Sequence, residues 1–169
     1  MMTIPKASLL ILILAFSMSP PQTVAAGKLR IAVLDFELKD LTLAPGIPAE
    51  IARTASIKPL LEKELEKSGY EIVAIARDEQ LKATAGVGYL FDHPEIAAAL
   101  AGQYGADYVI VGRLHKPSFL FVYLMAHLID VGKAKWVGDY ISEVKGGEKK
   151  LTLKGVESLT VKINRTLHR

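Results

Sequence analysis

The sequence predicts an α/β fold of the α+β kind, with a mixed β-sheet, a βαβ unit, a C-terminal antiparallel meander and helices packed on the sheet. Strand-like and amphipathic helical stretches alternate in the first two thirds of the chain, which is typical of parallel strands joined by helices. Three strand-like stretches then follow one another without a helix, which indicates antiparallel pairing. The 169 residues, half of them hydrophobic, suffice for one globular domain.

The N-terminus has the parts of a secretory signal peptide over residues 1–26. One positive charge precedes an apolar run at 7–18, a Ser-Pro-Pro sequence interrupts the run, and small residues follow at 24–26. The run is shorter than the ~20 residues that a membrane-spanning helix needs. We therefore expect export to the periplasm and a single mature domain over residues 27–169. The alternative is a chain anchored by an uncleaved N-terminal helix.

The mature domain opens with a predicted strand at 28–38, which leads into a loop at 39–48. A helix follows, with Ser56 as the expected N-cap, because Pro59 would then fall in its tolerated first turn. Its apolar face consists of Ile57, Leu60, Leu61 and Leu65. Residues 70–76 form the second predicted strand.

Two further helices are expected before the central strands. Asp78 is the expected cap of a short helix, and residues 83–91 read as a loop. Asp92 to Glu95 has the spacing of a capping box with proline in the first turn. Gly105 is well placed to terminate that helix.

The most apolar part of the chain predicts two long adjacent strands. The first covers residues 108–111, a break spans 112–118, and the second strand covers 119–131. A turn at 130–133 leads into a third strand at 136–144. After a polar turn at 145–150, the chain ends in an amphipathic helix whose apolar face is Val156, Leu159, Ile163 and Leu167.

The histidines predict no metal site. If Pro117 and Ser118 are the two turn residues between the apolar strands, His115 and His127 lie roughly 23 Å apart on opposite faces of the sheet. No histidine pair has the spacing of a helical zinc site.

The best-placed polar group is an acidic cluster of Asp35, Glu37 and Asp40 at the end of the first strand. Ligands of α/β sheets favour the carboxyl ends of parallel strands. Paired carboxylates there would be able to bind Ca²⁺ or a small molecule, although they supply fewer than the usual 6–8 oxygen ligands of calcium. The alternative interpretation is that Asp35 caps a loop and that the side chain of Glu37 is simply solvated.

Composition and motifs argue against other classes. The chain has no cysteine, so disulfides and thiolate chemistry are excluded. Without Lys6 it would carry 20 basic against 18 acidic residues, a near balance that does not indicate a nucleic-acid binder. Lysines 145, 149, 150 and 154 form a basic patch that reads as a solvated turn or as a weak contact with a membrane surface. No nucleophile elbow or dinucleotide fingerprint is present, so we expect neither an enzyme nor a bound cofactor.

Four segments resemble a known group of exported bacterial proteins. They are Ile31–Phe36, Gly69–Val73, Gly105–Gly112 and Leu128–Lys133. The chain is similar to the DUF2380 family, within the broader CsgG and TolB amino-terminal type of α/β domain. The family also has an apolar strand introduced by a serine, here Ser118. The resemblance implies this fold over the mature chain and a role in the cell envelope, where the broader relatives bind other proteins.

These observations together predict a periplasmic, non-catalytic binding or accessory protein of the cell envelope. It would act through protein contacts made by the loops at 38–51 and 83–91 and by an exposed strand edge. The alternative is a small-molecule or calcium-type binding protein that uses Asp35, Glu37 and Asp40. The sequence leaves the oligomeric state open.

Overall fold

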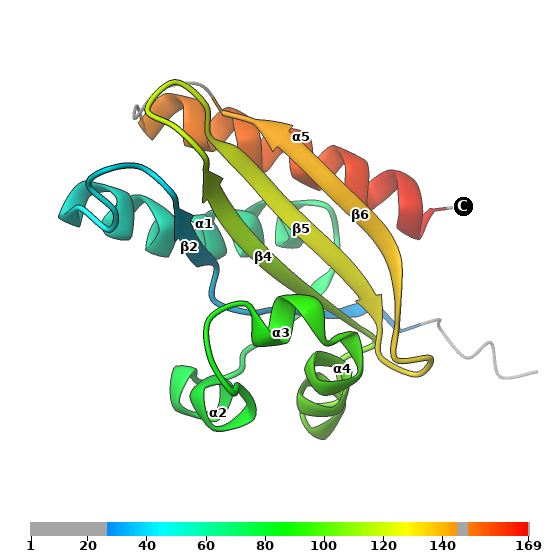
Figure 1. Cartoon of the computed structure of the whole chain (residues 1–169). Coiled ribbons are helices and arrows are strands. Elements are labelled where there is room, and N and C mark those ends of the chain that lie inside the picture. Colours follow the sequence, from blue (N-terminus) through cyan, green and yellow to red (C-terminus); the bar gives the residue numbers. More distant parts are fainter. Residues whose placement is uncertain (1–26, 145–148, 169) are drawn as a thin grey trace, which may run out of the picture.

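The computed structural model describes residues 27–144 and 149–168 (Figure 1). The expected signal peptide and most of the predicted turn at 145–150 lie outside these residues. No helix within the described ranges is long and apolar enough to cross a membrane. The elements are β1 (Arg30–Val33), β2 (Glu37–Asp40), α1 (Pro48–Lys67), β3 (Glu71–Val73), α2 (Arg77–Ala83), α3 (Tyr89–Asp92), α4 (Pro94–Gln103), β4 (Tyr108–Lys116), β5 (Tyr123–Asp130), β6 (Lys135–Glu143) and α5 (Lys149–Leu167).

The strands form one six-stranded mixed sheet in the order β3-β1-β4-β5-β6, and β2 pairs with β4 beyond the end of β1. The pairs β1–β3, β1–β4 and β2–β4 are parallel. The pairs β4–β5 and β5–β6 are antiparallel. The expected fold class is therefore confirmed: β1, α1 and β3 make the βαβ unit, and β4 to β6 make the meander.

Each face of the sheet has its own core because strand residues alternate between the two sides. On one face, Ile31 and Ile110 pack with α1 and α5, which lie behind the sheet in Figure 1. On the other face, Ala32 and Val109 pack with α3 and α4. The expected apolar face of the last helix is confirmed, since Val156, Leu159 and Ile163 are buried.

The predicted strand at 28–38 is interrupted at residues 34–36, so it is two strands and not one. The backbone N–H of Asp35 donates to the side chain of Gln80 (2.8 Å) and not to a neighbouring strand. Phe36 turns its ring into the core against Gly112, where a β-carbon would come within 2.0 Å of the ring. The interruption thus frees Asp35 from the sheet and fills the space that Gly112 leaves.

The helix starts also differ from the prediction. Helix α1 begins at Pro48, eight residues before the expected cap at Ser56, so Pro59 lies inside the helix. Proline is favoured at a first helical position, and Pro48 satisfies that preference better than Pro59 would. Asp78 lies in the first turn of α2 and does not cap it. The capping box is absent too: His93 precedes α4, and its ring bonds to Glu95 (3.0 Å).

The break between the two apolar strands is shorter than predicted. Strand β4 continues through Gly112 to Lys116, and residues 119–122 belong to the connecting loop, not to β5. The register pairs His115 with Tyr123 and His127 with Val111. The two histidines therefore share one face, four residues apart along the ladder, or about 13 Å. Both the predicted opposite faces and the predicted separation of roughly 23 Å are wrong. Gly105 follows α4 with a φ of 72°, as expected of a helix terminator.

Candidate functional site

A groove opens at the carboxyl end of β1, between α1 on one face of the sheet and α2 on the other. Two adjoining hollows of about 330 and 410 Å³ form it, and both are lined by Asp35, Phe36, Leu38 and Arg77. In open α/β sheets such a crevice arises where consecutive connections leave for opposite faces. The chain does this here: the connection from β1 to β3 runs through β2 and α1 on one face, and the connection from β3 to β4 begins with α2 on the other. The volumes fall in the range of ligand sites.

Asp35 lies where the two hollows meet. Its carboxylate accepts a bond from the Lys58 ammonium on α1 (3.1 Å), and both side chains retain contact with solvent. Its backbone is held from the other side by Gln80 of α2, which is buried and donates to the Ile75 carbonyl. Asp35 thus presents one ion pair to a groove that both helices support.

Glu37 borders the same groove, but its oxygens are already engaged. One accepts the backbone N–H of Gly88 (2.7 Å) and the other pairs with Arg113 (3.2 Å). The Arg113 guanidinium lies over the ring of Phe91, 4.1 Å from its centroid. Glu37 therefore fastens the loop before α3 to the sheet and fixes one wall of the groove.

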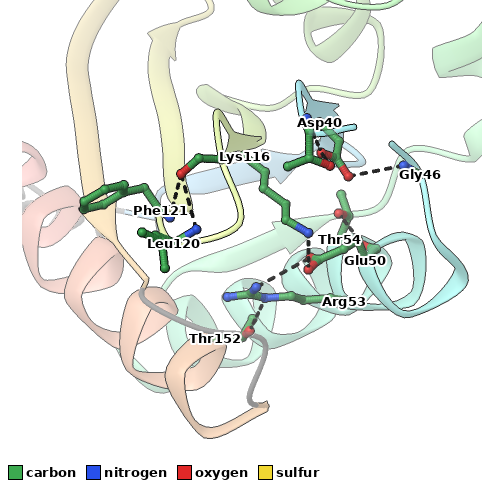
Figure 2. A network of polar contacts seen from close by, with 11 residues as sticks. Asp40, Gly46, Glu50, Arg53, Thr54, Lys116, Leu120, Phe121 and Thr152 are labelled. Carbon is green, nitrogen blue, oxygen red and sulfur yellow. Dashed lines mark hydrogen bonds and ion pairs between the residues drawn. The ribbon is translucent and has the colours of Figure 1, made fainter. Parts of the chain in front are cut away.

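Asp40 lies outside the groove and shapes the loop between β2 and α1. Its carboxylate accepts bonds from the backbone and hydroxyl of Thr42 (3.0 and 2.7 Å) and from the backbone of Gly46 (3.2 Å) (Figure 2). Burial alone would raise the pKa of Asp40, but these hydrogen bonds outweigh it and the pKa is lowered. The structure thus brings Asp35 and Glu37 to one groove and separates Asp40 from them.

The calcium-type alternative gains no support from this geometry. Each of the three carboxylates is bound to a cation or to backbone and hydroxyl donors of its own. Within residues 27–144 and 149–168, no three His, Cys, Asp or Glu side chains lie close enough to hold a metal ion.

The rim of the groove is apolar and exposed. Ile51 of α1, Leu81 of α2 and Val87 of the following loop line the hollows, and the side chain of Val87 is 86% exposed. Inside α1, Pro59 has no N–H to donate to the carbonyl of Ala55, which also lines the groove. The groove thus combines apolar walls with a few polar groups.

Sequence reasoning named the two loops that border the groove, at 38–51 and 83–91. It missed the wall formed by Lys58, Arg77 and Leu81. One sequence signal was available: Lys58 directly follows the apolar position Ile57 on the helix next to the acidic cluster. The sequence alone does not predict its pairing with Asp35, because that pairing depends on where the fold places the helix.

A second polar cluster is buried between α1, α5 and the end of β4 (Figure 2). Lys116 donates to Glu50 (3.0 Å), and the Arg53 guanidinium lies 3.5 Å from the other oxygen of Glu50. Arg53 also donates to the hydroxyl of Thr152 (2.9 Å). All four residues are buried, and we call them the buried charge cluster. It ties three elements together and places two cations against one carboxylate.

The fold is shared with solved structures of low sequence identity. TolB from Acinetobacter baumannii is 17% identical, with a TM-score of 0.53; the match covers 83% of this chain and 28% of TolB. The hypothetical protein CT253 from Chlamydia trachomatis is 13% identical, with a TM-score of 0.51 over 82% of this chain and 99% of that one. LpoB from E. coli is 11% identical, with a TM-score of 0.50; the match covers 83% of this chain and 82% of LpoB. These likenesses show the fold alone.

The sequence places the chain in a family. The model of DUF3280, described as protein of unknown function (DUF2380), matches residues 29–163, which is most of the chain. The chain belongs to this family, as the resemblance predicted. No curated protein matches it by sequence.

Proposed function

We propose that this chain is an exported, non-catalytic accessory protein of the cell envelope that binds a partner protein through the groove between α1 and α2. The observation that carries the proposal is the exposed apolar rim of Ile51, Leu81 and Val87 around the Asp35–Lys58 ion pair. Exposed apolar side chains gathered at a cleft are typical of interaction sites. The signal-peptide pattern at 1–26 and the resemblance to exported domains of the CsgG and TolB amino-terminal type support an envelope setting.

The chemistry of the groove suits a partner segment with an apolar side chain flanked by polar groups. Phe36, Leu38 and Ala55 supply apolar floor and walls. Asp35, Lys58 and Arg77 offer charges of both signs at the mouth, so they can fix the orientation of a bound segment without selecting for net charge.

Site-specific photocross-linking in the intact cell tests the partner. A photoreactive residue at Val87 should capture one dominant envelope protein, identified by mass spectrometry. Leu81→Asp should abolish that adduct because it places a charge on the apolar wall. Val161→Asp, a matched change at a half-exposed position of α5, should leave the adduct unchanged. An adduct insensitive to Leu81→Asp would contradict the proposed site.

The rival small-molecule function predicts a different result. A metabolite bound in the groove would remain with the purified protein in native mass spectrometry and would be lost in the Leu81→Asp variant. That outcome, without any protein adduct at Val87, would replace the partner-binding proposal.

Export itself is tested by the mass of the protein in the periplasmic fraction. Cleavage after Ala26 should leave a chain that begins at Gly27. A membrane-bound chain that retains Met1 would support the anchored alternative instead.

A further inference from the structure

An exposed apolar tip lies at the end of the sheet where β4 turns into β5. Three consecutive large side chains of the connecting loop are exposed: Phe119 by 63%, Leu120 by 75% and Phe121 by 42%. Leu41 of the neighbouring loop, also exposed, joins them because its N–H donates to the carbonyl of Lys116 (2.9 Å). Single exposed apolar residues are ordinary, but four gathered at one end are not. We call these four residues the apolar tip.

Hydrogen bonds hold two residues of the apolar tip, Leu120 and Phe121, in place (Figure 2). The hydroxyl of Ser118 accepts the backbone N–H groups of Leu120 and Phe121 (3.3 Å each). The Lys116 ammonium of the buried charge cluster lies 5.7 Å from the centre of the Phe119 ring. These contacts hold the loop with its apolar side chains outward, so covering those side chains would cost little conformational entropy.

Positive charge surrounds the apolar tip. Lys39 precedes it on β2, and Lys150 and Lys154 flank Thr152 of the buried charge cluster on α5; all three lysines are exposed. Lys116 and Arg53 lie beneath, but both are buried against Glu50 and present little charge to the surface. Among the described residues at this end, the three exposed lysines face two solvent-accessible carboxylates, Asp40 and Glu143. An anionic surface therefore complements this end of the molecule.

We infer that the apolar tip inserts into the surface of an anionic lipid bilayer, with the surrounding lysines on the headgroups. Apolar side chains plus nearby cations are the two signals that together give stable attachment to a membrane surface. A stable protein interface buries roughly 800 Å² on each partner, whereas the apolar tip consists of four side chains on two neighbouring loops. This inference uses residues outside the groove and goes beyond the partner binding proposed above.

The absence of cysteine allows a direct test with the full 169-residue chain. Leu120→Cys carrying a polarity-sensitive fluorophore reports the apolar tip, and Val161→Cys with the same label is the control on α5. Vesicles of phosphatidylcholine with about 30% phosphatidylglycerol should shift the Leu120 label to the blue and expose it to lipid-borne quenchers. The Val161 label should not respond, and pure phosphatidylcholine should bind far more weakly.

Charge variants complete the test. Lys150→Glu should weaken vesicle binding about tenfold or more, because it reverses a charge next to the anionic surface. Lys63→Glu, the same change at an exposed position of α1, should have little effect. The groove variant Leu81→Asp should still bind vesicles, so failure of this inference and failure of the proposed function are distinguishable.

Three results would overturn the inference. One is an unchanged Leu120 label with anionic vesicles, which would also be seen if only residues 1–26 touched the lipid. The second is an equal response at Val161. The third is a blue shift without vesicles that grows with protein concentration, because it would show a second copy of the chain on the tip.

Discussion

Within one short stretch, Asp35, Glu37 and Asp40 place their carboxylates in three different settings. Asp35 meets a lysine at the groove, Glu37 meets an arginine and a loop backbone, and Asp40 caps its own loop. The sequence predicts the acidic cluster at a strand end because three acids follow an apolar run. It does not predict the partners of Asp35 and Glu37, which come from α1, the loop before α3 and β4, all distant along the chain.

Gly112 illustrates a residue whose role depends on one distant side chain. A β-carbon there would come within 2.0 Å of the Phe36 ring. We therefore expect Gly112→Ala to lower the free energy of unfolding by roughly 1–3 kcal/mol or more, measured by urea denaturation. Gly132→Ala, where the nearest atom is 3.6 Å away, is the matched control and should cost much less.

A double variant separates this steric effect from a general loss of strand stability. Phe36→Leu removes the ring, so Gly112→Ala should cost less in that background than in the native one. Additive costs would show that the contact with Phe36 is not the reason for the glycine.

His127 should make stability depend on pH. Burial between the rings of Phe91 and Trp136 lowers its pKa from 6.5, with Arg113 acting in the same direction, although Asp139 and Asp92 oppose the shift. The unfolded chain then binds a proton more readily than the folded chain. The stability from this group is complete above about pH 6.5 and is lost as the pH falls toward the lowered pKa.

The measurement compares unfolding free energies at about pH 7.5 and 5 in the wild type and in His127→Phe. The variant should lose less stability on acidification, because it removes one buried group that must be protonated. Burial also lowers the pKa of His115, so the part of the pH dependence that comes from His115 should remain in the variant. An unchanged dependence of the unfolding free energy on pH in His127→Phe would contradict the assignment to His127.

At the scale of elements, α1 is joined to β4 and α5 by the buried charge cluster and, through Lys58, to Asp35 in the segment between β1 and β2. The helical spacing of the apolar residues in α1 could be predicted from the sequence, but the residue at which the helix begins could not. Two prolines compete as first-turn residues, and the helix begins at Pro48, with Pro59 in its interior. Likewise the end of β4 was not predicted, because Arg113 and Lys116 look like loop residues until their buried partners are known.

The buried charge cluster predicts an unequal effect of two similar substitutions on α1. Glu50→Gln removes the carboxylate and leaves Lys116 and Arg53 buried without their counter-ion, which should cost about 3–5 kcal/mol of unfolding free energy. Glu64→Gln breaks the exposed pair with Lys67 and should cost less than about 1 kcal/mol. Urea denaturation of both variants measures the difference; equal small costs would show that Glu50 does not neutralise the cluster.

At the scale of the whole molecule, two helical layers share one sheet, with α1 and α5 on one face and α2 to α4 on the other (Figure 1). This architecture was predictable because strand-like and helical stretches alternate and then give way to a meander. The groove was not, since it arises where connections to opposite layers diverge, and no local pattern records that divergence. The apolar tip was hidden for a related reason: its phenylalanines extend an apolar run that reads as strand.

The shared sheet predicts that both layers unfold together. Leu159 of α5 is fully buried, so Leu159→Ala should lower the unfolding free energy by about 2–5 kcal/mol. The single tryptophan, Trp136, stacks on His127 near α3, on the face opposite α5, and its fluorescence reports that layer. Far-UV circular dichroism reports all the helices. In Leu159→Ala both signals should therefore change at one lowered urea midpoint, as a single cooperative unit requires.

Val161→Ala, a half-exposed neighbour on the same helix, should shift the midpoint only slightly. A fluorescence midpoint that stays at the wild-type value while the helical signal moves would show that the two layers unfold separately.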